Sequence, residues 1–304
     1  MKKRKLGHSN LYVSEIGFGC MSLGTSEGEA IRIIHEAIDK GVNYFDTADL
    51  YDRGVNEEIV GKALKGKRHD VIIATKVGNR WTEQGDGWTW DPSKAYIKEA
   101  VKHSLRRLQT DYIDVYQLHG GTIDDPIDET IEAFEELQQE GVIRYYGISS
   151  MRPNVIREYV KRSRIVSVMM PYSLLDRRAE EWFPLLKQHH ISVIARGPLA
   201  KGLLTERPLD QASEEIKQNG YVDYLFDELV TLIPKLKAVA PNETLTAIAL
   251  RFCLAHEVVA TVVPGASRLT QLIENVAAQS VTLTDEQVAL LKQLTKQTIF
   301  TDHR

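Results

Sequence analysis

The stretch AIRIIHEAIDKGVNYFD, residues 30–46, contains the unit whose repetition decides the fold. In its first part, apolar residues recur every three or four positions, which is typical of an amphipathic helix. Gly41 predicts the end of that helix, because glycine is favoured just beyond a helix C-terminus. The next residues, Val42–Phe45, form a short apolar segment that reads as a strand and runs directly into Asp46. A helix, a glycine, a strand and a polar residue therefore follow one another without interruption.

The same order recurs along the chain. Strands are predicted at residues 16–19, 42–46, 71–76, 112–119, 143–149, 165–170, 191–196 and 258–263. Helices are predicted at residues 30–38, 57–64, 91–108, 127–140, 155–161, 179–189, 246–256, 269–278 and 285–294. Strands such as Val71–Ala74 are apolar at consecutive positions, as expected when both faces of a parallel sheet are buried.

These elements predict an α/β fold, namely one (β/α)8 or TIM barrel that takes up residues 1–304 as a single domain. Segments 3–6 and 11–13 flank a turn-rich tetrad and predict an N-terminal β-hairpin. The segments that follow the eighth predicted strand, 258–263, predict extra C-terminal helices. Two connections, 78–90 and 197–221, are longer than the fold requires and are expected as loops that carry binding or gating.

The composition indicates a soluble, cytoplasmic protein. A net charge of −4 without a basic face argues against a nucleic-acid partner. The basic start at residues 1–5 lacks the apolar core of a signal peptide, and no apolar run approaches the length of a membrane helix, so no membrane association is predicted. Cys20 and Cys253 give no disulfide framework. No cluster of residues has metal-ligand spacing, so no metal is predicted.

Polar and small residues stand at the carboxyl ends of the predicted strands. Asp46, Lys76 and His119 end three strands, and Tyr51 stands one short loop beyond Asp46. In a (β/α)8 barrel these ends converge on the mouth where the chemistry takes place, so the pattern predicts an enzyme. The other strands end at Gly19, Ser149, Met169, Arg196 and Gly265.

Two segments bear on nucleotide binding. Residues 17–22 lack the third glycine of the dinucleotide fingerprint, so they do not predict a doubly wound fold. Residues 264–268 follow the eighth strand and open a helix, where free N–H groups and the helix dipole favour an anion. Arg268 would add a bidentate partner for a phosphate. A capped helix with a surface arginine explains the same residues, and both interpretations stay open.

At these residues the chain resembles the aldo-keto reductase family over essentially its whole length. Gly41–Tyr51 is similar to the family's Asp/Tyr signature. Four further segments resemble its other signatures: Ala74–Lys76, Tyr116–His119, Gly147–Ser149 and Pro264–Asn275. Each segment alone is weakly specific, but their order at the strand ends is very specific. The resemblance implies a bacterial, NADPH-dependent enzyme that binds its cofactor across the barrel mouth and reduces small-molecule carbonyl compounds.

The resemblance implies a catalytic tetrad of Asp46, Tyr51, Lys76 and His119. The physical logic is clear without the family, because a carbonyl that accepts a hydride needs a proton. Tyrosine has a pKa of about 10 and is a poor acid at neutral pH unless its anion is stabilised. Lys76 would supply the stabilising cation, Asp46 would keep the lysine charged, and His119 would donate a hydrogen bond to the carbonyl oxygen. The alternative to a catalytic role is structural, with Asp46 and Lys76 as a buried ion pair and Tyr51 as a residue that packs its loop.

The resemblance also implies the residues that bind the cofactor. Those at the nicotinamide end are Gly19, Cys20, Met21, Ser149, Ser150, Met169, Arg196 and Gly197. Those at the pyrophosphate and adenosine end are Leu199, Lys201, Gly202, Gly265, Ser267, Arg268, Gln271, Glu274 and Asn275. The chain departs from the family at three nicotinamide positions, where an asparagine, a glutamine and a stacking tyrosine are replaced by Ser150, Met169 and Arg196. Cys20 could face the cavity, but inert packing is the better explanation for it.

Three tryptophans, Trp81, Trp88 and Trp90, crowd the connection after Lys76 and suggest an aromatic wall for an apolar substrate. Packing of the loop onto the barrel is an alternative of almost equal weight. For the whole protein, a cofactor-binding regulatory module with little turnover is the alternative to a reductase. A third interpretation uses Lys76 as a Schiff-base lysine in an aldolase-type barrel.

Overall fold

The computed structural model describes residues 1–82 and 87–304, and its centre is a sheet of eight parallel strands. The strands are β3 (Phe18–Gly19), β4 (Tyr44–Asp46), β5 (Ile72–Val77), β8 (Ile113–Leu118), β9 (Ile143–Ser149), β10 (Ser167–Pro171), β11 (Ser192–Arg196) and β12 (Val259–Val263). They neighbour one another in chain order. The first and last strands meet through parallel bridges from Ile16 to Val262 and from Gly19 to Gly265, which close the sheet. The predicted (β/α)8 barrel is confirmed.

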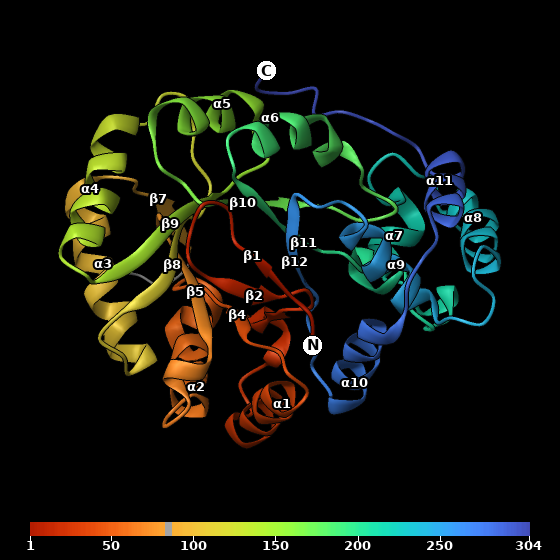
Figure 1. Ribbon diagram of the computed structural model, residues 1–304, viewed down its shortest axis with the longest axis horizontal. Helices are drawn as coiled ribbons and strands as arrows, with labels where there is room; N and C mark the ends of the chain where they lie inside the picture. The colour runs from red at the N-terminus through yellow and green to blue at the C-terminus, as the bar shows by residue number, and fades with distance from the viewer. Residues whose placement is uncertain (83–86) are drawn as a thin grey trace.

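Helices surround the sheet (Figure 1). They are α1 (Glu27–Asp39), α2 (Val55–Ala63), α3 (Lys94–Leu108), α4 (Ile127–Gln139), α5 (Pro153–Arg162), α6 (Phe183–Gln188), α7 (Glu214–Asn219), α8 (Phe226–Ala238), α9 (Leu245–Leu254), α10 (Leu269–Ala277) and α11 (Asp285–Leu294). Side-chain caps set several starts, as expected for serine and threonine just before a helix. The Ser93 hydroxyl accepts from the Tyr96 N–H, and Thr284 forms a capping box with Gln287.

The N-terminal hairpin lies across one end of the barrel (Figure 1). Its strands, β1 (Lys3–Lys5) and β2 (Tyr12–Ser14), pair antiparallel. Between and within these strands, Leu6, Leu11 and Val13 are buried in one cluster with side chains from inside the barrel, such as Tyr44. The hairpin thus closes the amino-terminal end of the barrel, and the opposite end is left for a site.

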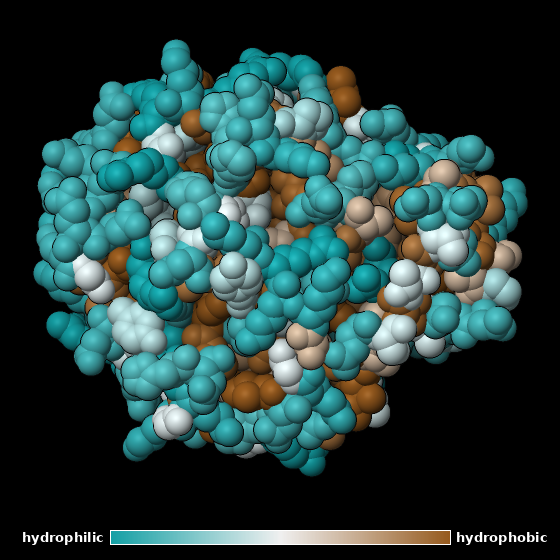
Figure 2. Space-filling model, viewed as in Figure 1, coloured by the Kyte–Doolittle hydropathy of each residue, from teal (hydrophilic) through white to brown (hydrophobic). Residues whose placement is uncertain are grey.

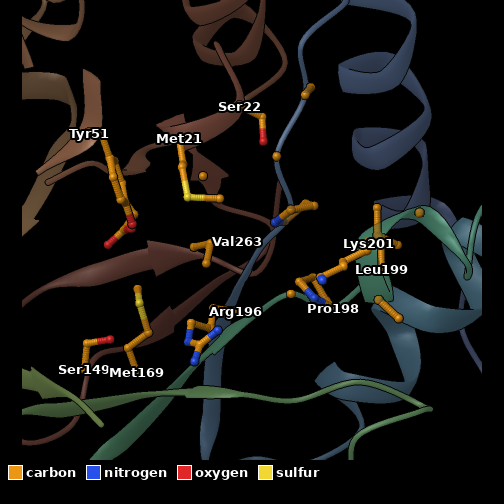
Figure 3. A pocket seen from close by; sticks show the side chains of 18 of the residues that line it. Met21, Ser22, Tyr51, Ser149, Met169, Arg196, Pro198, Leu199, Lys201 and Val263 are labelled. Carbon is orange, nitrogen blue, oxygen red and sulfur yellow. The ribbon is translucent and has the colours of Figure 1, made fainter. Parts of the chain in front are cut away.

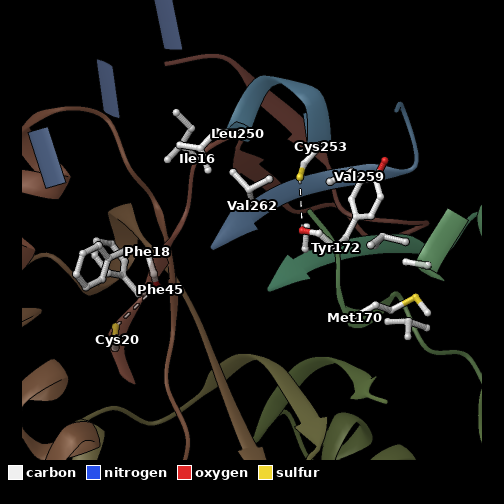
Figure 4. Packing of buried hydrophobic residues seen from close by; sticks show 14 of the residues in the cluster. Ile16, Phe18, Cys20, Phe45, Met170, Tyr172, Leu250, Cys253, Val259 and Val262 are labelled. Carbon is white, nitrogen blue, oxygen red and sulfur yellow. Dashed lines mark hydrogen bonds between the residues drawn. The ribbon is translucent and has the colours of Figure 1, made fainter. Parts of the chain in front are cut away.

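The main core lies between the sheet and the helices. Figure 4 shows a part of it, in which Ile16, Leu250 and Val262 pack together. Both cysteines are fully buried there, and the Cys253 thiol donates to the Tyr172 carbonyl oxygen at 3.5 Å. Hydrophobic side chains on the face drawn in Figure 2 lie mainly in hollows between hydrophilic ones. No helix in the described ranges is both long and apolar enough for a bilayer crossing.

The structure differs from the prediction in several details. The connection 78–90 is not only a loop, because β6 (Asn79–Trp81) and β7 (Trp88–Trp90) pair as an antiparallel hairpin; residues 83–86 of that prediction lie outside the described residues. The helix expected at 179–189 starts as a 3-10 turn, and the α-helix α6 begins only at Phe183. Pro184 stands in its first turn, where a missing N–H costs no hydrogen bond.

The segment expected as a long excursion after β11 contains more regular structure than we predicted. It includes α7 and is followed by α8, a helix with no counterpart among the predicted ones. Pro234 lies inside α8, and an interior proline normally marks the end of a helix. Because of the proline, the sequence did not indicate this helix. Its buried face packs against the core and consists of Leu229, Leu232, Ile233 and Leu236.

Candidate active site

A large cavity of about 1560 Å³ opens at the carboxyl ends of the barrel strands. It exceeds the roughly 300–1,000 Å³ of a typical small-molecule site, so it has room for a dinucleotide and a second small molecule. All four predicted catalytic residues line it: Asp46, Tyr51, Lys76 and His119. The strand ends place these residues together because β4, β5 and β8 are adjacent in the sheet.

The floor of this cavity is a buried ion pair. The Lys76 ammonium lies 2.5 Å from Asp46 Oδ1, and the two side chains are only 1% and 6% exposed. Lys76 Nζ also donates to the Thr47 carbonyl oxygen at 2.8 Å and to the Tyr51 hydroxyl at 3.2 Å. All three ammonium protons therefore have acceptors. The lysine is fixed between a carboxylate and a phenol.

Two residues that sequence reasoning missed support this pair. The Gln117 side-chain amide donates to Asp46 Oδ2 at 3.1 Å, so the second carboxylate oxygen is also held. Asn56 accepts from the Thr47 hydroxyl at 2.7 Å and donates to the Cys20 carbonyl oxygen at 2.9 Å, which fixes the loop after Asp46. Gln117 had a visible signal, because it lies two positions before His119 and thus on the same face of its strand.

The electrostatics of the pair keep the lysine charged. Burial alone would lower the pKa of Lys76, but the nearby Asp46 carboxylate and Tyr51 hydroxyl more than offset burial and raise it. Burial raises the pKa of Asp46, while Lys76 opposes that shift. A lysine whose pKa is raised is a poor amine nucleophile at neutral pH, since Schiff-base lysines need a lowered pKa. This disfavours the aldolase-type interpretation.

Tyr51 is followed by an unusual backbone segment. Asp52, Arg53 and Gly54 all have positive φ, at 48°, 55° and 88°. The left-handed region is costly for residues with a Cβ, so the surrounding structure must hold this turn. Arg107 lies against Gly54, where a Cβ would come within 2.7 Å of the arginine Cδ, and its guanidinium pairs with the buried Glu57 at 2.7 Å. The turn after Tyr51 is thereby clamped between α2 and α3.

His119 completes the polar end of the cavity. Its ring meets the Tyr51 ring edge-on, with centroids 6.0 Å apart and an interplanar angle of 86°. Burial lowers the pKa of His119 to about 3, and the positive charges of Lys76 and Arg196 add to the effect. The imidazole is therefore neutral at physiological pH. A neutral ring carries one N–H, so it can donate a hydrogen bond to a ligand without adding charge.

Most predicted cofactor residues line the same cavity. Around strands β3, β9, β10 and β11 they are Gly19, Met21, Ser149, Ser150, Met169, Arg196, Gly197, Leu199, Lys201 and Gly202. Beyond β12 they are Gly265, Ser267, Arg268, Gln271, Glu274 and Asn275. The lining contains six basic side chains and three acidic ones, an excess that favours an anionic ligand.

The segment beyond β12 is held by internal hydrogen bonds. Ser267 donates to the Gln271 side chain from both its N–H, at 2.9 Å, and its hydroxyl, at 3.1 Å. Asn275 donates to the Gly265 carbonyl oxygen at 3.2 Å, and Glu274 accepts from the Thr246 hydroxyl. Arg268 is the N-cap residue of α10 and is exposed at the cavity edge.

Figure 3 shows two of the three positions at which the chain departs from the family pattern, Met169 and Arg196, and Ser149 next to the third. Met169 lies beside Ser149, and Arg196 lies between Met169 and the Pro198–Lys201 segment, across the cavity from Tyr51. The Arg196 guanidinium reaches the Met151 sulfur at 3.9 Å. Arg196 lines the cavity, and no carboxylate in residues 1–82 or 87–304 forms an ion pair with it.

Two predicted residues lie elsewhere. Cys20 is fully buried in the core, with its thiol near the Phe18 carbonyl oxygen at 3.9 Å, and it does not line the cavity. Trp81 lines a separate, smaller cavity, where the Arg53 guanidinium lies 5.2 Å from its ring centroid. Trp88 and Trp90 do line the large cavity. Only two of the three tryptophans therefore stand where an aromatic wall would need them.

Comparison with known proteins agrees with this geometry. A model of the Aldo/keto reductase family matches residues 15–296. The chain is 64% identical to YqkF of Bacillus subtilis (strain 168), described as an uncharacterized oxidoreductase, over 100% of both proteins. It is 32% identical to L-galactose dehydrogenase of Arabidopsis thaliana, over 90% of this chain and 87% of that protein.

Solved structures agree as well. The holo form of aldo-keto reductase AKR11C1 from Bacillus halodurans is 62% identical, covers 100% of this chain and 99% of its own, and superposes with a TM-score of 0.95. Glycerol dehydrogenase AKR11B4 from Gluconobacter oxydans is 26% identical, with 96% and 94% of the two chains covered and a TM-score of 0.88. The chain therefore belongs to the aldo/keto reductase family of oxidoreductases.

Proposed function

We propose that the protein reduces aldehyde or ketone carbonyls to alcohols with NADPH, and that Tyr51 is the proton donor. The observation that carries the proposal is the Lys76 ammonium, which bridges the Asp46 carboxylate and the Tyr51 hydroxyl on the cavity floor. A phenol gives up its proton more readily when a fixed cation stabilises the phenolate. A purely structural ion pair has no need of a tyrosine hydroxyl at the edge of an open cavity.

The cavity lining fits the dinucleotide. Its excess of basic side chains suits phosphate groups, and Arg268 together with the N-terminus of α10 suits a terminal phosphate. Lys201 and Gly202 line the cavity after β11, and Ser149 and Met169 line it at the ends of β9 and β10. The similar AKR11C1 has a structure in its holo form, which supports a bound cofactor in this fold. When bound, NADPH supplies the hydride to the carbonyl carbon.

The chain's own residues would handle the carbonyl oxygen and its proton. His119, neutral because its pKa is so low, would donate a hydrogen bond that orients the oxygen beside Tyr51. Tyr51 would transfer its hydroxyl proton to that oxygen while Lys76 stabilises the phenolate left behind. Asp46, held by Gln117, would keep Lys76 in place. Trp88 and Trp90 would form an apolar wall next to the reacting group.

The most direct test is a panel of aldehydes and ketones at fixed NADPH, with the loss of reduced-nicotinamide absorbance as the readout. We expect turnover with at least one simple aldehyde. Tight NADPH binding, measured by calorimetry, with no turnover across the panel would favour the regulatory alternative instead.

Arg268→Ala is expected to weaken NADPH binding selectively. Arg268 lies at the cavity edge, and no carboxylate of the described chain pairs with it, so its guanidinium is available for the 2′-phosphate that NADH lacks. A charge-assisted hydrogen bond contributes about 1.5–3 kcal/mol, which corresponds to roughly 10- to 150-fold in the dissociation constant. Calorimetric titration of both cofactors measures the effect. Equal losses for NADPH and NADH would contradict the assignment.

Arg196→Tyr is expected to lower the ratio of the NADP+ to the NADPH dissociation constant. If Arg196 lies against the nicotinamide, its guanidinium can stack on either ring but repels only the oxidised, positively charged one. Two unit charges about 4 Å apart interact by about 1 kcal/mol in water and more in a protein, so the wild type should favour the reduced cofactor severalfold. Titrations of both cofactors against wild type and variant give the ratio. An unchanged ratio would place Arg196 away from the ring.

A further inference from the structure

We propose that Arg152 binds a carboxylate on the substrate, so that the preferred substrates are carbonyl compounds with an acid group a short distance from the reacting carbon. This inference rests on the proposed reductase function and specifies its substrate class. Arg152 belongs to none of the predicted site residues, yet it lines the same cavity as Tyr51 and His119. Its side chain is half-buried at the start of α5, directly after the end of β9.

The guanidinium is anchored close to the catalytic residues. Arg152 Nη1 donates to the Gly121 carbonyl oxygen at 2.5 Å, and the Arg152 N–H donates to the Ser150 hydroxyl at 3.2 Å. Gly121 comes two residues after His119, and two residues of extended chain span at most about 7 Å. The charged group is therefore positioned near the histidine that would hold the carbonyl oxygen.

Most of the donors of Arg152 remain available. Arginine has five N–H donors on its side chain, and among the described residues only one of them has a protein acceptor. In the described part of the chain no carboxylate forms an ion pair with Arg152. The planar fork of donors on a guanidinium matches a carboxylate, so Arg152 is suited to bind an anionic ligand in the cavity.

The neighbouring acid does not supply that partner. Asp125, in the same loop as Gly121, forms no ion pair with Arg152 and accepts three hydrogen bonds from other donors. Its Oδ1 accepts from the Trp90 indole N–H at 3.0 Å and from the Thr122 hydroxyl at 2.7 Å, and its Oδ2 accepts from the Thr122 N–H at 2.7 Å. Among residues 1–82 and 87–304, Arg152 therefore has no carboxylate within ion-pair distance, and it lines the same cavity as Trp90.

The cofactor has its own cations elsewhere in the cavity. Arg268 follows β12 and Lys201 follows β11, whereas Arg152 follows β9, which lies three strands from β12 in the sheet. Trp90 lies over Gly120, where an added Cβ would come within 3.3 Å of the ring. Arg152 and Trp90 thus define a compartment with an apolar wall and a cation, which suits an aldehyde that carries both a ring or chain and an acid group.

The experiment compares para-formylbenzoate with para-formylbenzamide, a neutral aldehyde of nearly the same shape. The variants are Arg152→Gln and, as a control for general charge loss on the same helix, Lys161→Gln, whose side chain is exposed near the far end of α5. We expect Arg152→Gln to raise the KM for para-formylbenzoate by about 10- to 150-fold. The KM for para-formylbenzamide should change less than about twofold. The dissociation constant for NADPH and all constants of Lys161→Gln should stay near wild type.

Several outcomes overturn the proposal. Equal KM changes for both aldehydes would assign Arg152 to general packing, and a weakened NADPH with unchanged KM values would assign it to the cofactor. Unchanged constants throughout would leave it without a role in binding. If the benzamide is reduced but Arg152→Gln has no selective effect, only this inference fails and the reductase function stands.

A binding measurement decides the matter even without turnover. Benzoate and benzamide, which lack the aldehyde group, are titrated into the protein with NADPH present, and calorimetry gives their dissociation constants. Wild type should bind benzoate more tightly than benzamide, and Arg152→Gln should lose that preference. If neither aldehyde is reduced and benzoate still binds through Arg152, the reductase function fails while the anion site stands. If benzoate has no advantage in wild type, the anion site is wrong.

Discussion

Tyr51→Phe is expected to slow NADPH-dependent aldehyde reduction by roughly 10²- to 10⁴-fold, the usual contribution of one positioned general acid. The substitution keeps the ring, its edge-on contact with His119 and the position of the Lys76 ammonium over its face, at 4.9 Å from the centroid. It removes only the hydroxyl, which lies 3.2 Å from Lys76 Nζ. Single-turnover rates at saturating NADPH measure the effect on the chemical step.

Tyr116→Phe is the matched control for this prediction. Tyr116 lies on β8 of the same barrel, is fully buried, and its hydroxyl has no hydrogen-bond partner in the described structure. Removal of that hydroxyl should leave the rate near wild type, and NADPH affinity should hardly change in either variant. A Tyr51→Phe enzyme with near-normal single-turnover rates would refute the assignment of the acid.

The pH dependence of the rate gives an independent check on the acid. Because the pKa of His119 is about 3, the histidine does not change its charge between about pH 5 and pH 9. A rate that falls with rising pH in this range therefore reports a group other than His119. We expect this fall in wild type and its absence in the residual rate of Tyr51→Phe.

The strand ends were the most predictable part of the molecule. Asp46, Lys76 and His119 each follow an apolar segment, and a parallel barrel has only one end at which such residues can meet. The contact between Lys76 and Tyr51 then follows from the short loop after Asp46. The predicted cluster needed no knowledge of distances, because the periodic pattern alone places the three strand ends together.

The residues that were missed depend on contacts between distant segments. The role proposed for Arg152 depends on its contact with Gly121, thirty-one positions earlier in the chain, and Asp125 accepts one of its hydrogen bonds from the indole of Trp90. Trp81 was grouped with Trp88 and Trp90 by proximity in the sequence, but the hairpin carries it into another cavity. The helix α8 was not predicted because it contains Pro234, and proline has a very low helix propensity. Packing of its apolar face against the core stabilises the helix nevertheless.

Lys76→Met is expected to abolish measurable turnover and to destabilise the fold. The substitution removes the cation that would stabilise the Tyr51 phenolate, and it leaves the Asp46 carboxylate buried with only the Gln117 amide as a side-chain donor. Loss of one partner from a buried pair typically costs about 3–5 kcal/mol. Thermal unfolding and substrate turnover measure the two effects separately.

The double variant Asp46→Asn/Lys76→Met separates catalysis from stability. It has no buried charge at this position, and replacement of a whole buried pair is often nearly neutral for stability. We therefore expect the double variant to recover most of the lost thermal stability and none of the activity. Recovery of both properties would show that Lys76 contributes only to the fold, and recovery of neither would show that the pair is needed as a pair.

The dependence of stability on pH tests the same argument from the carboxylate side. Burial raises the pKa of Asp46 in wild type while Lys76 opposes the shift, so loss of the lysine should raise it further. In Lys76→Met the folded state would then hold a proton on Asp46 that the unfolded state releases above a pH of about 4. Such a group stabilises the fold at low pH and loses that contribution as the pH rises. The unfolding free energy of Lys76→Met relative to the double variant should therefore increase as the pH is lowered from about 8 to about 5. A constant difference across this range would mean that Asp46 is not left as an unpaired buried carboxylate, and the proposed dependence of Lys76 on Asp46 would be wrong.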